Sequence, residues 1–251
     1  MKYIDKLISK LLKNPLPIDE FINTLNSSDR FYNNIDLEKE LLINNGLPLY
    51  FSKNKVYLKT TITNLANQVF CILDIETTAP TPNQGQLLEI GAIKLKNNTI
   101  IETYQALVNC NHIPPKIEEI TGIKVDDTLQ ADSLKTVLEE IKIFIEDDII
   151  VAHNIDFDYN FLSKSFELYD LGKLYNRKIC SIKLAQKTIQ AEKYGLKYLT
   201  EKLNIPIENH HRAYDDALCT TKIFLHCLQN IPSNIKTSED LIYFSQNSIK
   251  I

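Results

Sequence analysis

The stretch VFCILDIETT, residues 69–78, is the most informative in the sequence, because it joins an apolar run typical of a buried strand to two carboxylates. Residues 69–73 form an unbroken apolar run, which is typical of a strand covered on both faces in an α/β sheet. Side chains at positions i and i+2 of a strand share a face, so Asp74 and Glu76 project together. Two carboxylates held this close share a proton or bind a cation. The stretch therefore predicts a cation site at the carboxyl end of a central strand.

The composition limits the classes of function. The chain has 251 residues, a net charge of −4 and a hydrophobic fraction of 44%. Whole-chain basicity does not indicate a nucleic-acid binder, so local charge or metal would have to hold such a substrate. No stretch reaches the roughly 18 apolar residues of a membrane span, and the first residues lack the pattern of a signal peptide. The five cysteines form no C-x-x-C pair, which favours reduced packing cysteines in a cytoplasmic protein without a membrane partner.

Two further polar clusters follow along the chain. VAHNIDFD, residues 151–158, places aspartates just after another short apolar strand, and HHRAYDDA, residues 210–217, places histidines and aspartates at the start of the last strong helix. A carboxylate set with one histidine and no cysteine favours Mg²⁺ or Mn²⁺ over structural zinc. Two such ions about 4 Å apart are the usual apparatus for attack on a phosphodiester. The clusters therefore predict metal-dependent phosphodiester chemistry.

LDIETT, AHNIDFD and HRAYDDA, in that order, resemble the three motifs of the DEDDh 3′–5′ exonucleases. Within that superfamily the chain is similar to the epsilon proofreading subunits of bacterial DNA polymerase III, over about residues 68–230. The resemblance implies a ribonuclease H-like fold, a mixed sheet flanked by helices, which agrees with the α/β pattern of the sequence. It also implies an enzyme that releases nucleoside monophosphates from single-stranded or frayed DNA 3′ ends, in replication proofreading, with the polymerase III catalytic subunit as partner.

The resemblance also implies roles for individual residues. Four carboxylates would bind two Mg²⁺ or Mn²⁺ ions: Asp74, Glu76, Asp158 and Asp216. Asp74 would bridge the two ions, and His211 would act as the general base on a water molecule. Thr77 and Thr78 would flank the terminal nucleotide, and Glu89 would contact its sugar hydroxyl. All four carboxylates and His211 would then be catalytic.

The second and third motifs each offer a choice of aspartate. In the second motif, the family pattern H-N-x-x-F-D places phenylalanine directly before the ligand, which selects Asp158 over its neighbour Asp156. In the third motif, the family pattern is H-x-A-x-x-D. The pairs His210/Asp215 and His211/Asp216 both have the right interval, but only His211 is followed two residues later by alanine. We therefore choose His211 and Asp216.

We predict that the first 65 residues form a separate unit. The exonuclease domain would then follow over residues 66–232. Apolar residues at helical spacing predict helices over residues 3–12 and 18–25 and a third within residues 35–46, with Asp36 as its N-cap and Gly46 past its end. PLYFSKNKVYLKT, residues 48–60, then predicts two short strands around a turn. This order resembles a winged helix-turn-helix. The third helix carries more acidic than basic residues, so we favour protein contact over DNA binding.

The chain ends FSQNSIKI, inside a predicted C-terminal tail of residues 233–251. Residues 246–251, with Gln246, Ser248, Ile249 and Ile251, resemble the peptides that bind bacterial sliding clamps. The alternatives are a frayed terminus or packing of the isoleucines on the protein's own surface. The sliding clamp is therefore a candidate partner.

Three other functions stay open from the sequence. An exonuclease that trims RNA 3′ ends would use the same site. A non-catalytic adaptor would bind through the N-terminal unit and the tail, although retention of all five active-site residues argues against it. A winged-helix regulator would bind duplex DNA through residues 1–65. Release of mononucleotides that depends on divalent ions separates the enzyme from the last two.

Overall fold

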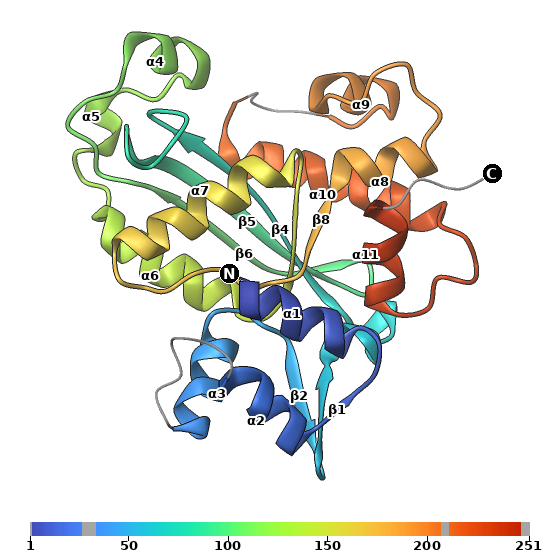
Figure 1. Ribbon diagram of the computed structural model, residues 1–251. Coiled ribbons are helices and arrows are strands. Elements are labelled where there is room, and N and C mark those ends of the chain that lie inside the picture. Colours follow the sequence, from blue (N-terminus) through green and yellow to red (C-terminus); the bar gives the residue numbers. More distant parts are fainter. Residues whose placement is uncertain (1, 27–33, 207–210, 247–251) are drawn as a thin grey trace.

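The structure is a computed structural model that describes residues 2–26, 34–206 and 211–246 (Figure 1). Its larger part is built on a five-stranded sheet with the order β6-β5-β4-β7-β8. The strands are β4 (Val69–Thr77), β5 (Leu87–Lys96), β6 (Thr99–Leu107), β7 (Ile149–Ala152) and β8 (Lys178–Cys180). Strand β5 is antiparallel to both of its neighbours, β4 and β6, whereas β7 and β8 run parallel to β4, so the sheet is mixed as predicted.

Helices cover both faces of this sheet. They are α4 (Pro115–Thr121), α5 (Val125–Thr128), α6 (Leu134–Ile145), α7 (Ile155–Leu168), α8 (Ser181–Thr188), α9 (Leu196–Lys202), α10 (Ala213–Gln229) and α11 (Ser238–Gln246). Strand β4 is buried on both sides, because Leu73 packs with α6 and α7 while Ile72 packs with α8, α10 and α11. The apolar run of the first motif therefore has the two-sided burial that its sequence predicts.

Strands β5 and β6 form the predicted hairpin, which turns at Asn97 and Asn98. Both residues have a left-handed backbone, with φ of 47° and 60°. Asparagine tolerates this conformation better than most residues, and consecutive left-handed residues suit the right-handed twist of a hairpin. The hairpin holds β5 beside β4 in a fixed register, which matters for the site described below.

The N-terminal unit contains three helices and a small sheet of order β1-β3-β2. Its elements are α1 (Lys2–Leu11), α2 (Ile18–Asn26), α3 (Ile35–Asn44), β1 (Leu16–Pro17), β2 (Leu49–Ser52) and β3 (Lys55–Leu58). They share an apolar core that includes Leu7, Phe21 and Val56. The predicted helices and hairpin are therefore present, and the assignment to the winged-helix class stays a prediction.

The prediction of Asp36 as the N-cap of α3 is wrong. The cap is Asn34, whose side-chain oxygen accepts hydrogen bonds from the backbone N–H groups of Asp36 and Leu37. Asparagine is as good an N-cap as aspartate, and Asn34 has the extended backbone that the cap position requires.

Helix α11 differs most from the prediction. Leu241 and Ile242 are 0% and 1% exposed and belong to the core that α8 and α10 share with the sheet. The Ser238 hydroxyl donates to Gln68 Oε1 at 2.8 Å, and Glu239 accepts a hydrogen bond from Thr60 at 2.6 Å. Residues 238–246 are thus part of the folded domain, and the prediction of a tail is wrong for them. Among the described residues, we find no helix with the length and apolarity needed to cross a membrane.

Candidate active site

The register of β4 against β5 places four polar or small residues on one face of the sheet. Asp74 lies opposite Gly91, and Glu76 lies opposite Glu89. All four share the face that Ile72 presents to α10, because side chains alternate along a strand. The regular pairing is interrupted between Glu76 and Thr77, where β4 ends. The two carboxylates of the first motif therefore project from the carboxyl end of the central strand toward α10.

Gly91 allows the start of α10 to lie directly against the sheet. A Cβ atom at this position would be 2.3 Å from Tyr214 Cα and 2.4 Å from Tyr214 N. Both are backbone atoms that cannot rotate away, so only glycine fits such an approach. The close packing brings the first turn of α10, and with it Asp216, toward the carboxylates of β4.

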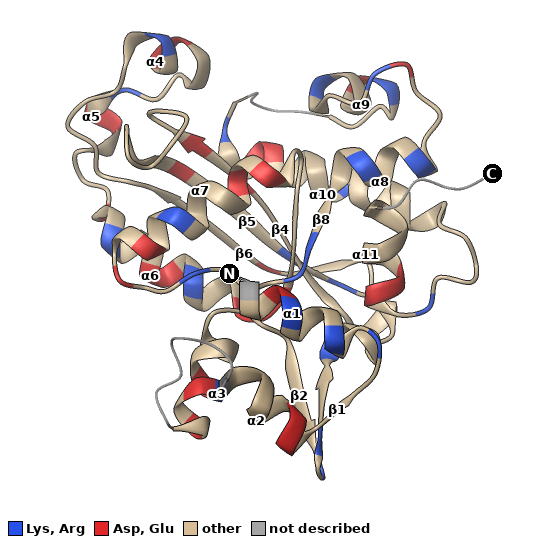
Figure 2. Ribbon diagram, viewed as in Figure 1, with Lys and Arg blue, Asp and Glu red and all other residues tan. Residues whose placement is uncertain are grey.

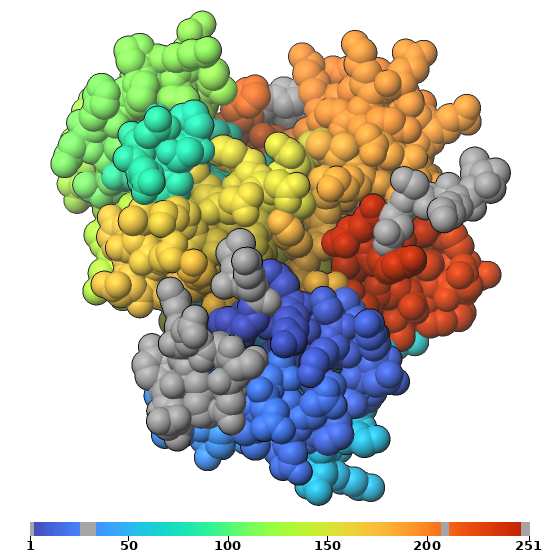
Figure 3. All heavy atoms as spheres, viewed as in Figure 1, coloured from blue at the N-terminus to red at the C-terminus, as the bar shows by residue number. Residues whose placement is uncertain are grey.

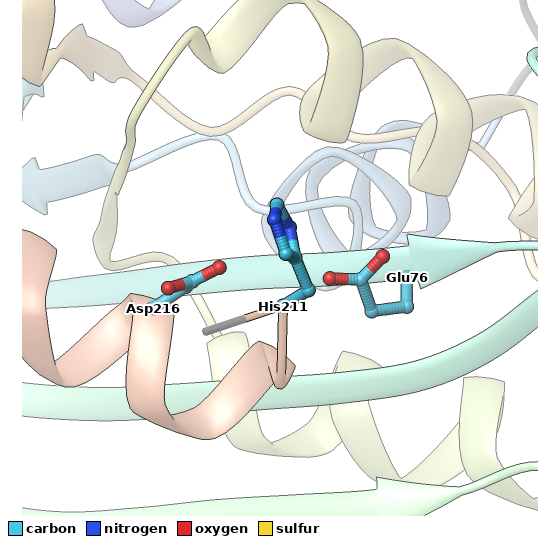
Figure 4. Close-up of side chains that lie close together, drawn as sticks. All are labelled: Glu76, His211 and Asp216. Atoms are coloured by element: carbon cyan, nitrogen blue, oxygen red, sulfur yellow. The ribbon is translucent and has the colours of Figure 1, made fainter. Parts of the chain in front are cut away.

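Glu76, His211 and Asp216 form a compact group (Figure 4). One ligand atom from each lies within 4.8 Å of those of the other two. Asp216 is 8% exposed, whereas His211 is exposed and has a left-handed backbone with φ of 59°. The structure thus gathers the chosen pair of the third motif with the first motif. Asp215 is not in this group, and His210 lies outside the described residues.

Asp158 reaches the same site from the first turn of α7. Asn154 has a left-handed backbone with φ of 79°, which turns the chain sharply from β7 into this helix. Asp158 is 4% exposed, and its burial raises its pKa to about 7. The neighbouring Asp156 points elsewhere, because it forms an ion pair of 2.8 Å with Lys178. The placement agrees with the choice of Asp158 in the second motif.

The carboxylates share one poorly solvated environment. Burial raises the pKa of Asp74 well above its ordinary value, and the charges of Asp158, Asp216 and Glu76 raise it further. Burial and the charges of Asp216, Glu89 and Asp158 likewise raise the pKa of Glu76 to about 8. Like charges this close disfavour ionisation unless a cation neutralises them. A divalent ion with a preference for oxygen, such as Mg²⁺ or Mn²⁺, therefore fits this donor set.

Glu89 is held by the start of α10. Arg212 donates three hydrogen bonds to its carboxylate at 2.7–3.2 Å, and the Ala213 backbone N–H donates a fourth at 2.9 Å. Glu89 is only 6% exposed, so this paired arrangement fixes the segment that follows His211. Arg212 is a site residue that sequence reasoning missed, because its partner lies 123 positions away. The predicted contact of Glu89 with a sugar hydroxyl stays a prediction.

Thr77 and Thr78 use their hydroxyls to shape the loop between β4 and β5. Thr77 Oγ1 donates to the Ala79 carbonyl at 2.9 Å, and Thr78 Oγ1 accepts from the Gln86 backbone N–H at 2.8 Å. Both residues are 8% exposed. They lie next to the carboxylates in the chain, but their side chains serve the loop, and a contact with the terminal nucleotide stays a prediction.

His153, the histidine of the second motif, lies apart from the group formed by Glu76, His211 and Asp216. Its Nδ1 atom is 2.8 Å from the Ser181 hydroxyl, which connects the end of β7 to the start of α8. Burial lowers its pKa to about 4, so the imidazole is neutral at pH 7. His153 therefore supports the local structure of the site, whereas His211 is the histidine that lies among the carboxylates.

The chain is similar to several known proteins. The family model described as "Exonuclease" matches residues 71–224. The 3′-5′ exonuclease DinG of Staphylococcus epidermidis is 32% identical over 181 residues, 71% of this chain and 20% of that protein. The PolC-type DNA polymerase III of Thermotoga maritima is 37% identical over 164 residues, 64% of this chain and 12% of that protein. The structure of exonuclease X with 5′ overhanging duplex DNA has a TM-score of 0.55 and 22% identity, covering 70% of this chain and 99% of that one.

These similarities confirm the predicted fold and the predicted family resemblance. The chain spans only a fifth or less of the two curated relatives, which are much longer proteins. The likeness to exonuclease X, at 22% identity, concerns the fold alone. The two relatives are named DinG and PolC-type polymerase, so the finer likeness to the epsilon subunit stays a prediction.

Proposed function

Because the chain belongs to the exonuclease family whose model matches residues 71–224, we propose that it is a 3′–5′ exonuclease that releases nucleoside monophosphates from DNA ends. The observation that supports this most is the group of Glu76, His211 and Asp216 within 4.8 Å, contributed by two motifs far apart in sequence. Asp74 and Asp158 complete the set, since their raised pKa values reflect burial in the same site. A non-catalytic adaptor has no need of such a costly cluster of buried carboxylates.

Asp74, Glu76, Asp158 and Asp216 would hold the divalent ions, which supply positive charge for the scissile phosphate and acidify the attacking water. His211 is placed to accept a proton from that water, because its imidazole is exposed and lies beside Glu76 and Asp216. Arg212 and the Ala213 N–H bind Glu89, so the backbone just after His211 is anchored to β5.

We further propose a role in DNA replication, such as proofreading beside a polymerase. The similarity to a PolC-type polymerase supports this context. The sliding clamp stays a candidate partner through residues 246–251. Gln246 is the last residue of α11, and the other residues of this peptide lie outside the described part of the chain. The matched and mismatched substrates of the experiment below address the proofreading role directly.

The test is release of nucleotides from 3′-labelled oligonucleotides in the presence of Mg²⁺. Asp74→Ala should slow release by about 100-fold or more, because even the outer partners of bound metals contribute about 10- to 100-fold. The matched control is Asp156→Ala, which removes an exposed aspartate of the second motif that pairs with Lys178. Mismatched DNA ends should be digested faster than paired ends, because less unpairing is required.

Near-normal release by folded Asp74→Ala would refute the assignment of the site. The same oligonucleotides made of RNA give the comparison between the two substrate classes. Faster digestion of RNA than of DNA would instead indicate an exonuclease that trims RNA 3′ ends.

A further inference from the structure

Helices α8 and α9 carry a concentration of positive charge that the net charge of the chain conceals. Residues 178–206 contain six lysines and two glutamates, without aspartate or arginine, for a net charge of +4 in a chain of net charge −4. Figure 2 shows cations along α8 and α9, and acidic residues on β4, β5, α7 and α10 as well as on elements farther from the site. The charges of the two regions are therefore opposite in sign.

Four of these lysines face solvent and form no salt bridge within the part of the chain that the structure describes. They are Lys183, Lys193, Lys197 and Lys202, and we call them the lysine surface. The other two lysines are engaged, since Lys178 pairs with Asp156 and Lys187 donates to the Phe244 carbonyl. Because no salt bridge among the described residues neutralises it, the charge of the lysine surface is available to a negatively charged partner.

Helices α8 and α9, whose segment carries the lysine surface, adjoin the elements of the candidate active site. Helix α8 begins directly after Cys180, which pairs in the sheet with Ala152 at the start of the second motif. A second contact, of 2.8 Å between His153 Nδ1 and the Ser181 hydroxyl, also joins the start of α8 to the second motif. Helix α9 precedes the third motif in the chain and packs, like α8, on α10. Figure 3 shows the surface hollowed between the lobe of α8 and α9 and the lobe of α4 and α5.

The negative charge of the candidate active site disfavours the binding of a nucleic-acid strand. The buried carboxylates repel phosphates, and bound divalent ions offset that repulsion only near the terminal nucleotide. The strand behind the 3′ end carries a negative charge at every phosphate, and lysines along its path lower the free energy of binding by releasing counterions. Basic grooves of this kind track the backbone of single strands without reading their sequence.

We propose that the lysine surface binds the phosphate backbone of the single-stranded DNA that trails behind the 3′ end. This inference rests on the proposed exonuclease function and adds the route that the substrate takes across the protein. It assigns to the lysines the binding of longer strands, and leaves hydrolysis of the terminal phosphodiester to the carboxylates and His211. An acidic protein thus gains affinity for DNA from one local surface.

The experiment compares two variants with the same change of net charge. The first is Lys193→Gln, Lys197→Gln and Lys202→Gln together, and the matched control replaces three exposed lysines of the N-terminal unit: Lys13→Gln, Lys53→Gln and Lys55→Gln. Binding of a labelled single-stranded oligonucleotide is measured by anisotropy in EDTA across a range of salt concentrations. Hydrolysis of the p-nitrophenyl ester of thymidine 5′-monophosphate, which has no trailing strand, is measured with Mg²⁺.

The lysine-surface variant should bind DNA more weakly, and the slope of log affinity against log salt should fall by up to about 2, since each lost phosphate contact contributes about 0.7 for single strands. Its hydrolysis of the small ester should match that of the wild type, and the control variant should retain the full salt slope. An unchanged slope, or an equal loss in the control, would overturn the proposal. Wild-type protein that hydrolyses neither ester nor oligonucleotide would instead refute the exonuclease function. If the triple variant does not fold, Lys197→Gln alone is measured instead, and its salt slope should fall by about a third as much.

Discussion

Substitution of Gly91 by alanine tests whether the approach of α10 to β5 builds the site. The added Cβ would be 2.3 Å from Tyr214 Cα, 2.4 Å from Tyr214 N and 2.6 Å from the Ala213 carbonyl carbon. Ordinary contacts of a Cβ atom begin at 3.4 Å, so the start of α10 must retreat by about 1 Å. Because Gly91 lies directly opposite Asp74, this retreat moves Asp216 and His211 away from the carboxylates of β4.

The expected cost is larger in catalysis than in stability. Forcing an extra methyl group into a well-packed contact costs about 1–3 kcal/mol of the free energy of unfolding. A displacement of about 1 Å in a catalytic site can cost about 100-fold in rate. We therefore expect Gly91→Ala to fold, to melt at a lower temperature, and to release nucleotides about 100-fold more slowly from 3′-labelled oligonucleotides under single-turnover conditions.

Gly195→Ala is the matched control. A Cβ at Gly195 would meet nothing within 4 Å, and the residue has an ordinary negative φ of −69°. Its substitution should change stability by no more than about 1 kcal/mol, the scale of an altered N-cap, and should leave the rate of release unchanged. If Gly91→Ala releases nucleotides as fast as the wild type and melts at the same temperature, the position of α10 does not depend on this contact.

Three further predictions follow from burial and charge. Asp216→Ala should nearly abolish nucleotide release while Asp215→Ala retains most of it, because only Asp216 lies in the group with His211; equal rates would show that the register of the third motif is wrong. In EDTA the melting temperature should fall as pH rises from about 4 to 8, because folded Glu76 and Asp158 keep protons that the unfolded chain has already lost. Mg²⁺ should then raise the melting temperature more at pH 8 than at pH 5, and the opposite order would contradict a carboxylate metal site. Leu241→Ala should lower the free energy of unfolding, measured in urea, by about 2–5 kcal/mol, since the Leu241 side chain is 0% exposed. A loss near zero would show that α11 does not pack on the domain.

Features that depend on local pattern could be predicted from the amino-acid sequence. The apolar run before Asp74 predicts a strand buried on both faces, and β4 has that burial. The two asparagines at Asn97 and Asn98 predict a hairpin turn, which the structure contains. The intervals within the three motifs predict which residue types gather at the site. Each of these inferences uses residues that are close in the chain, where strand alternation and turn chemistry leave few choices.

Contacts between distant segments could not be predicted in this way, because they depend on how the elements pack. The pairing of Glu89 with Arg212 depends on the register of β5 and on where α10 begins, and no local pattern contains either. The role of Gly91 depends on the same contact. Helix α11 is short and lies at the end of the chain, yet its Leu241 and Ile242 fill space that α8, α10 and the sheet leave between them. Burial of this kind is a property of the packed arrangement, because the apolar surface that covers a side chain is supplied by other elements.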